Sequence, residues 1–185
     1  LKRYGVTETE ENVIICAGSQ HALACSLLSS FREGERIAAD EMTYPGMKTL
    51  AGMLRIKLIP VRNDSYGMIP EDLASVCRRD KIKGLYVMPS IQNPTLSTMN
   101  EKRRDEIAQT ASQFSLTVIE DDAYIHTAAK PGTPLYSRIP ESTIYIAGIS
   151  KAFGAGLRIS FVCAPSGIRQ NMTGAVLNTL WMIPP

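Results

Sequence analysis

Histidines and closely spaced cysteines are scarce in this chain of 185 residues. It contains only two histidines, His21 and His126, and its four cysteines form no Cys-x-x-Cys pair. Because a zinc site needs cysteine and histidine ligands that converge, we expect no metal site. Unpaired cysteines within apolar runs are typical of reduced, buried thiols, which favours a cytoplasmic location.

Long apolar runs and a strong charge of one sign are also missing. No stretch is long enough to span a bilayer and no signal peptide is visible, so we expect no membrane partner. The 20 basic and 18 acidic residues leave a net charge of +2, which indicates no general affinity for nucleic acid. The densest basic segments, 77–83 and 101–106, are interleaved with acids, and we interpret both as solvated helix faces.

The chain does contain a regular alternation of short β-rich runs and amphipathic segments. The pattern predicts strands over 12–18, 36–40, 57–61, 84–89, 116–121, 143–148 and 158–165. It predicts helices over 19–31, 45–54, 70–79, 100–114 and 166–181. Such alternation predicts an α/β fold with three α/β/α layers and a mostly parallel sheet. No repeat or linker divides the chain, so we expect one domain over 1–185. Since the chain begins at Leu1 without methionine and stops at Pro185, we interpret it as a fragment of a longer protein.

Polar side chains follow four of the predicted strands, at the edge where open parallel sheets bind ligands. Ser19, a plausible N-cap, and Gln20 begin a predicted helix, whose free N–H groups and dipole suit a phosphate. The later strand ends supply an amide, a carboxylate, a phenol and an amine: Asn93, Asp121, Tyr124 and Lys151. Each alone has a commonplace explanation as a helix cap, a turn or a surface charge. Their order at successive strand ends predicts one site.

The ordered motifs GSQHAL, TYPG, QNPT, IEDDAY and SKAFGAGLR resemble the large domain of fold-type I pyridoxal-5′-phosphate (PLP) enzymes, the class I and II aminotransferases. The resemblance covers nearly the whole chain, and the ordered set is specific although each motif alone is weak. It implies PLP as the cofactor, an amino acid or another amine as the ligand, and a homodimer.

The resemblance also implies a role for each residue of the expected site. Lys151 would form a Schiff base with PLP, Arg158 would clamp the phosphate, and Asp121 would pair with the pyridinium nitrogen. Asp121 is preferred to Asp122 because its D-x-x-Y spacing from Tyr124 matches the family. The other contacts would be to the ring oxygen from Asn93 and Tyr124, to the ring face from Tyr44, and to the phosphate from Ser19, Gln20 and Ser150.

Lys151 lies among glycines and alanines in GISKAFGAGLRISF, residues 148–161. A lysine in such a stretch is either a solvated loop charge or an amine held for chemistry. We expect it to be desolvated beside Arg158, where it can act as a nucleophile, with small neighbours leaving room for the ring. The chain departs from the family pattern at Gly148, where many relatives have serine, and at Leu96, where glycine is usual.

Two functional classes remain open. We favour the effector domain of a MocR-type regulator of the GntR superfamily. This group is the one most resembled by three segments of the chain: YVMPSIQNPTLSTMNEKRRDEIA, VIEDDAY and LNTLWMIPP. In that group an aminotransferase-like domain follows a winged helix-turn-helix, so DNA would be contacted only through an N-terminal domain outside this chain. The alternative is a free-standing PLP-dependent aminotransferase acting on an amino acid and a 2-oxo acid. An unrelated α/β domain would lack the visible absorption of lysine-bound PLP.

Overall fold

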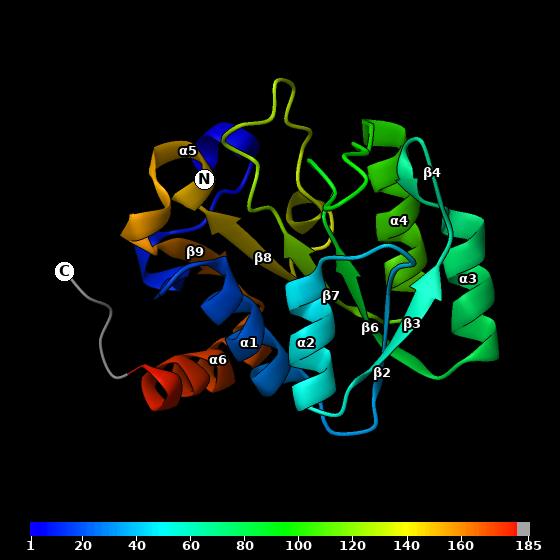
Figure 1. Cartoon of the computed structure of the whole chain (residues 1–185), viewed down its shortest axis with the longest axis horizontal. Coiled ribbons are helices and arrows are strands. Elements are labelled where there is room, and N and C mark those ends of the chain that lie inside the picture. The colour runs from blue at the N-terminus through cyan, green and yellow to red at the C-terminus, as the bar shows by residue number, and fades with distance from the viewer. Residues whose placement is uncertain (181–185) are drawn as a thin grey trace.

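The computed structural model describes residues 1–180, which form three layers: one central sheet with a layer of helices on each face (Figure 1). Its seven strands lie in the order β1-β9-β8-β7-β6-β2-β3. The five strands from β8 to β3 run parallel, whereas β9 is antiparallel to both of its neighbours, β8 and β1. The expected α/β class and mostly parallel sheet are therefore confirmed.

The elements lie close to the bounds that the sequence predicts. The sheet consists of β1 Val13–Cys16, β2 Arg36–Asp40, β3 Lys57–Val61, β6 Ile82–Val87, β7 Thr117–Asp121, β8 Thr143–Gly148 and β9 Ser160–Cys163. A separate small hairpin joins β4 Asn63–Asp64 to β5 Gly67–Met68. The helices are α1 Ser19–Ser30, α2 Pro45–Met53, α3 Pro70–Arg79, α4 Glu101–Gln113, α5 Ser150–Phe153 and α6 Ser166–Thr179. The predicted closing helix is one described residue too long, because α6 ends at Thr179 and Leu180 is its C-cap. Position 181 lies outside the described residues, with the rest of the WMIPP end.

Local chemistry explains where several helices begin. Pro45 and Pro70 occupy the first turns of α2 and α3, where a missing N–H costs nothing and the fixed φ suits a helix. Asn100 caps α4, because its side chain accepts a hydrogen bond from the Arg103 N–H at 2.8 Å.

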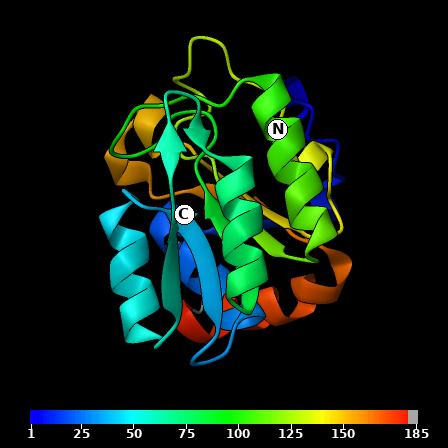
Figure 2. The ribbon, with the colours of Figure 1, turned by 90° about the vertical axis from the view of Figure 1, so that its right-hand side faces the viewer.

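Helices cover both faces of the sheet, as Figure 2 shows for α2 and α3 on opposite sides of β3. Ile119 packs into the core beneath α1, α2 and α6, whereas Val118 packs into the core beneath α3 and α4. Because successive strand residues point to opposite faces, Asp121 shares the face of Ile119, and Glu120 shares that of Val118. This alternation decides which acid at the end of β7 faces which side.

One expectation about charge is wrong. Segment 101–106 is not a uniformly solvated face, because Arg104 is fully buried. Arg104 lies three residues before Ile107, on the side of α4 that packs against the sheet. Its neighbour Arg103 has a side chain only 13% exposed and forms an ion pair with Asp64 at 2.8 Å. A charge count along the sequence does not distinguish these inward arginines from the exposed Lys102.

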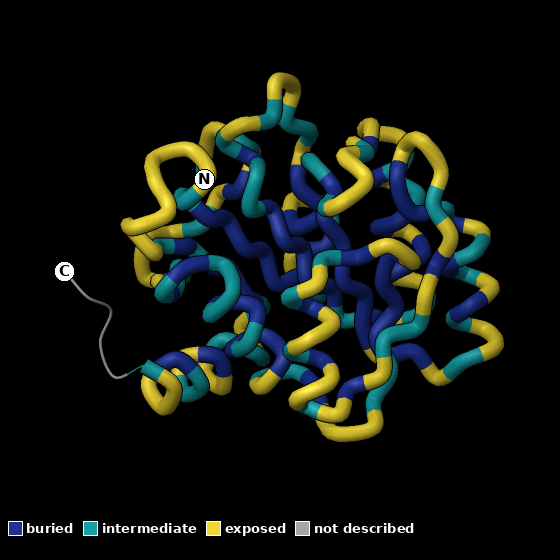
Figure 3. The backbone as a smooth tube through the Cα atoms, viewed as in Figure 1, coloured by how far each residue is buried: buried dark blue, intermediate teal, exposed yellow. Residues whose placement is uncertain are grey.

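The inner strands of the sheet are largely buried, the edge strands β1 and β3 less so, and exposed segments surround the sheet (Figure 3). All four cysteines are free, and three of them are buried. Within residues 1–180, no helix is long and apolar enough to cross a membrane.

Candidate functional site

A cavity lies at the carboxyl ends of β6, β7 and β8. All nine residues expected from the sequence line it: Ser19, Gln20, Tyr44, Asn93, Asp121, Tyr124, Ser150, Lys151 and Arg158. Met88, Ala123 and Gly148 complete the lining. The fold thus brings residues from widely separated segments to one place. The strand-end argument predicts six of the nine, and the family resemblance implies the other three: Tyr44, Ser150 and Arg158.

Asp121 supplies a buried carboxylate to this cavity. It ends β7 and is 4% exposed. Its Oδ2 accepts a hydrogen bond from the Tyr86 hydroxyl at 2.9 Å, whereas its Oδ1 has no hydrogen-bond partner. Burial raises the pKa of Asp121 to about 6, with the bond from Tyr86 and the nearby Ala123 N–H opposing that shift. A buried acceptor without a donor is costly, so this oxygen is suited to a ligand that brings an N–H group or a positive charge.

Tyr86 is a residue of the site that sequence reasoning missed. It is fully buried in β6 and holds one oxygen of Asp121 in place. The available signal was a tyrosine inside the otherwise apolar run GLYVMP, since a buried phenol usually needs a hydrogen-bond partner.

Asp122 lies on the other side of the sheet. Its Oδ2 accepts a hydrogen bond from the Tyr145 hydroxyl at 3.4 Å, and it does not line the cavity. The strand alternation therefore separates the two neighbouring acids, and only Asp121 faces the candidate ligand.

The start of α1 differs by one residue from the sequence expectation. Gly18, not Ser19, is the N-cap, with φ 85, and its carbonyl accepts the Ala22 N–H at 3.0 Å. The expected cap was wrong because glycine adopts this left-handed backbone more easily than serine. The Ser19 side chain makes no capping bond, and its hydroxyl lies against Gly148, where a Cβ would overlap it. Ser19 thus offers its hydroxyl and a first-turn N–H group to the cavity.

A cation lies beside this helix start. A Cβ added to Gly18 would come 2.7 Å from Nη2 of Arg158, so the guanidinium occupies the space that the glycine leaves. The Ser150 hydroxyl is buried and has no hydrogen-bond partner. A helix N-terminus, an arginine and an unpartnered hydroxyl together suit a phosphate group.

Tyr44 and Gln20 hold each other at the edge of the cavity. The Tyr44 hydroxyl donates to Gln20 Oε1 at 3.1 Å, and Gln20 Nε2 donates to the Gly46 carbonyl at 3.5 Å. A Cβ at Gly46 would overlap the Tyr44 ring. These contacts use the Gln20 amide oxygen and one of the two amide hydrogens, so the backbone N–H of Gln20 in the first turn of α1 and the second amide hydrogen remain for an anion.

Gln92 anchors the turn that carries Asn93. It is 2% exposed, and its Nε2 donates to Asp40 Oδ2 at 3.2 Å and to the Met42 carbonyl at 2.6 Å. Its Oε1 accepts the Thr95 N–H at 2.8 Å. Asn93 is therefore fixed relative to the segment after β2, which leads to Tyr44. Sequence reasoning missed this role of Gln92, although the residue lies within the QNPT motif.

Lys151 lines the cavity but is exposed, contrary to the expected desolvation. Its Nζ lies 5.4 Å from the centroid of the Tyr124 ring. The expectation was wrong because residues 150–157 form two single-turn helices without buried residues, so small side chains leave the amine open to water. Phe153 in the same segment is 71% exposed.

The geometry suits one kind of ligand. The cavity offers a buried acceptor at Asp121, a phosphate-binding corner around Ser19 and Arg158, a phenol ring at Tyr44, and an amine at Lys151. A molecule with a protonated ring nitrogen, a phosphate and a carbonyl would satisfy all four. Among residues 1–180, no group of three histidine, cysteine or acidic side chains is placed to hold a metal ion.

Comparisons with known proteins agree with this geometry. The chain matches the family described as aminotransferase class I and II over residues 1–181. It is 34% identical, over all of its residues, to YdeF of Bacillus subtilis, an uncharacterized HTH-type transcriptional regulator, and spans 40% of that protein.

Two solved structures are similar along nearly the whole chain. An archaeal alanine:glyoxylate aminotransferase superposes with a TM-score of 0.93 at 25% identity, covering 100% of this chain and 48% of the other. The second is LysN, the α-aminoadipate aminotransferase of Thermus thermophilus, complexed with N-(5′-phosphopyridoxyl)-L-leucine. It superposes with a TM-score of 0.88 at 27% identity, covering 94% of this chain and 46% of the other. The chain therefore spans less than half the length of each of these relatives.

Proposed function

The chain belongs to the aminotransferase class I and II family, and from this premise we propose that its cavity binds pyridoxal 5′-phosphate. The observation that carries the proposal is the unpartnered Oδ1 of Asp121, a buried residue that ends β7 and lines the cavity. The ring nitrogen of PLP would supply the donor that this oxygen lacks. When bound, PLP supplies an aldehyde that links to an amine and a ring that withdraws electrons from it.

Each of the nine expected residues then has a defined task. Asp121 holds the proton on the ring nitrogen, because a carboxylate beside a cation remains ionised. Lys151 provides the amine that links to the cofactor, and Arg158 binds the phosphate together with Ser19 and Ser150. The remaining contacts are Asn93 and Tyr124 at the ring oxygen, Tyr44 on the ring face, and the Gln20 N–H at the phosphate.

We propose further that the domain senses an amino compound within a MocR-type regulator of the GntR superfamily. The match of the whole chain to 40% of an HTH-type regulator at 34% identity supports this, since the two aminotransferases above are 25% and 27% identical. DNA would be bound through a domain outside this chain, and the regulator would act as a homodimer in the cytoplasm. The similarity to solved aminotransferases supports the alternative, a free-standing enzyme that transfers an amino group to a 2-oxo acid.

The two functions demand different work from Lys151. A sensor needs Lys151 only to release the cofactor to an incoming amine and to take it back, with a change of shape between the two states. An enzyme needs Lys151 also to move a proton in every cycle. The demand on the lysine is therefore greater in the enzyme.

Two assays on one preparation of the protein that carries this domain test the proposal. The first measures binding to its operator DNA with and without PLP and amino compounds. The second follows the cofactor spectrum while common amino acids are added. We expect operator binding that depends on PLP or an amine, with slow or no transamination. Brisk turnover without specific DNA binding would leave the aminotransferase, and a protein without visible absorption after incubation with PLP would contradict both.

A further inference from the structure

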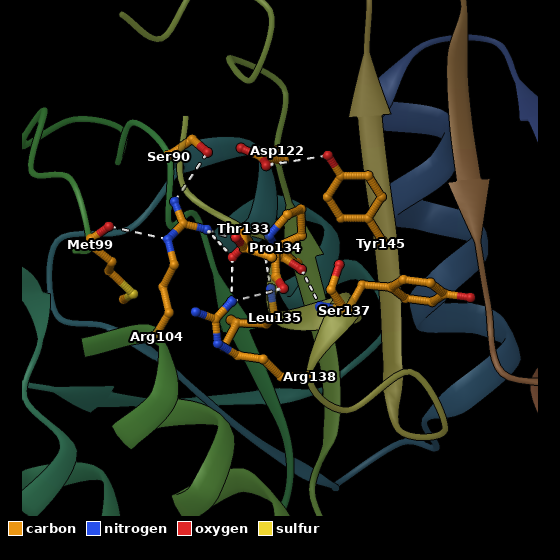
Figure 4. Close-up of polar contacts among 12 residues, drawn as sticks. Ser90, Met99, Arg104, Asp122, Thr133, Pro134, Leu135, Ser137, Arg138 and Tyr145 are labelled. Carbon is orange, nitrogen blue, oxygen red and sulfur yellow. Dashed lines mark hydrogen bonds and ion pairs between the residues drawn. The ribbon is translucent and has the colours of Figure 1, made fainter. Parts of the chain in front are cut away.

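A fully buried arginine lies behind the candidate site, on the opposite face of the sheet. The Arg104 guanidinium donates from Nε to the Met99 carbonyl at 3.1 Å, from Nη1 to the Thr133 carbonyl at 3.3 Å, and from Nη2 to the Ser90 hydroxyl at 3.3 Å (Figure 4). Its side chain is 0% exposed. A buried cation costs several kcal/mol unless charges and hydrogen bonds compensate, so its surroundings show what it stabilises.

The compensating charges are the two acids that flank Asp121. Glu120 Oε1 lies 3.8 Å from Nη1 of Arg104, and both side chains are 0% exposed. Asp122 is 1% exposed and also lies on this side of the sheet, where it accepts the Tyr145 hydroxyl (Figure 4). Burial raises the pKa of Asp122 to about 6, with Ser90 and Arg104 opposing the shift. One guanidinium therefore serves two buried carboxyls.

Glu120 also fixes a second segment of the chain. Its Oε1 accepts the Leu135 N–H and its Oε2 accepts the Tyr136 N–H, each at 2.9 Å. Both oxygens thus act as acceptors, which is the geometry of an ionised carboxylate. Arg104 and Glu120 together fasten residues 133–136 to the end of β7.

Arg104 closes the loop that carries Asn93. Ser90 and Met99 lie at the two ends of that loop, and Arg104 binds both. The same two ends are joined by the Met99 N–H, which donates to the Pro89 carbonyl at 2.9 Å. The loop conformation that places Asn93 at the cavity therefore depends on a side chain from the opposite face of the sheet.

We propose that Arg104 is a positioning residue for the cofactor site: it closes the Asn93 loop and balances the charges of Glu120 and Asp122 on either side of Asp121. The inference rests on the proposed function, because Asn93 and Asp121 position PLP only if PLP binds. Arg104 itself does not line the cavity.

Loss of the guanidinium has a specific structural consequence. Burial, followed by the neighbouring Asp122, raises the pKa of Glu120, whereas the Tyr136 N–H, Arg104 and the Leu135 N–H oppose this shift. Without Arg104 that pKa rises further, so Glu120 takes up a proton more readily, and one oxygen of the protonated form becomes a donor. A protonated carboxyl cannot accept both the Leu135 and Tyr136 N–H groups as well as before, so residues 133–136 loosen along with the Asn93 loop.

Three variants test the proposal: Arg104→Met, Arg104→Lys and the double variant Arg104→Met/Glu120→Gln. Arg103→Met is the matched control, since Arg103 lies on the same helix and pairs with Asp64 and the carbonyls of Gly67 and Met68. Amide hydrogen exchange of the PLP-free protein reports the segments 88–100 and 131–139. A spectroscopic titration with PLP reports the affinity of the site.

We expect Arg104→Met to speed exchange in both segments and to weaken PLP binding by about tenfold or more, because hydrogen bonds to a charged group are lost. Arg104→Lys keeps the charge but cannot reach three segments, so it should loosen 88–100 more than 131–139. The double variant removes both buried charges, but the Gln amide offers only one acceptor oxygen to the Leu135 and Tyr136 N–H groups, so exchange should be faster in both segments, as in Arg104→Met. Arg103→Met should leave both segments and the PLP affinity unchanged.

The two readouts separate this inference from the proposed function. If the wild-type protein does not bind PLP, the proposed function fails, while exchange still decides whether Arg104 closes the loop. If Arg104→Met does not fold, exchange in 88–100 and PLP affinity are measured on Arg104→Lys and the double variant instead. Unchanged exchange in 88–100 in these variants, or faster exchange with unchanged PLP affinity, would overturn the positioning role.

Discussion

Replacing Asp121 with asparagine should have opposite effects on stability and on cofactor binding. Asparagine has almost the same shape and can still accept the hydrogen bond from Tyr86, but it cannot be ionised. In the PLP-free protein the wild-type carboxylate has one oxygen without a partner and is buried. The substitution therefore removes a buried charge that only the cofactor neutralises.

The magnitude follows from the pKa of Asp121, raised from 3.8 to about 6. A raised pKa means that the folded protein binds the proton more tightly, so stability present below about pH 4 is lost as the pH rises through about 6. A shift of this size corresponds to roughly 3 kcal/mol. Asparagine does not titrate, so the variant should gain up to about 3 kcal/mol over the PLP-free wild type at pH 8 and little near pH 4.

Cofactor binding should change in the other direction. A charge-assisted hydrogen bond to the ring nitrogen contributes on the order of 1.5–3 kcal/mol, so Asp121→Asn should weaken PLP binding by roughly ten- to a hundredfold. Transamination, if the protein performs it, should be suppressed as well.

Urea unfolding of the PLP-free proteins near pH 4 and pH 8 measures the first effect, and titration with PLP measures the second. Asp122→Asn is the control, because it lies on the other face of the sheet and should leave PLP affinity nearly unchanged. A variant less stable than the wild type at pH 8 would refute the argument from burial. If Asp122 proved the sensitive acid, the assignment at this strand end would be wrong by one residue.

Three further substitutions test the cofactor link at Lys151, the backbone strain at Leu96 and the start of α1 at Gly18. Lys151→Ala should abolish the borohydride-reducible link to PLP. Mass mapping that found the cofactor on another lysine would refute the assignment of Lys151 as the linking residue. Leu96→Gly should stabilise the protein by up to about 1 kcal/mol in urea unfolding, because Leu96 has φ 62 and is 73% exposed, and left-handed strain exceeds the entropy cost of glycine. Gly18→Ala should lower PLP affinity and cost about 1–2 kcal/mol, because its φ is 85 and a Cβ would displace Arg158. Gly174→Ala serves as the control for Gly18→Ala. A Cβ at Gly174 meets nothing within 4 Å, so this change should lower neither the PLP affinity nor the stability.

Local patterns in the sequence determined the class of fold and the strand-end residues of the cavity. Apolar periodicity fixes whether a segment becomes a strand or a helix, and the parallel arrangement then brings strand ends to one edge. That reasoning was sufficient to predict that Asn93, Asp121 and Lys151 line one cavity. It required no knowledge of which strands are neighbours.

Contacts between distant segments decided the rest, because they depend on strand order and on which helix face turns inward. Tyr86 meets Asp121 only because β6 and β7 are neighbours in the sheet. Arg104 is buried because α4 packs on the face toward which Glu120 points. The sequence EKRRDE alone does not show which of its charged residues will face the sheet. Lys151 remains exposed because its segment packs against too little of the described chain, which a list of small neighbours in the sequence cannot reveal. Burial of a charge is a property of the tertiary structure, since the atoms that surround it come from elsewhere in the chain.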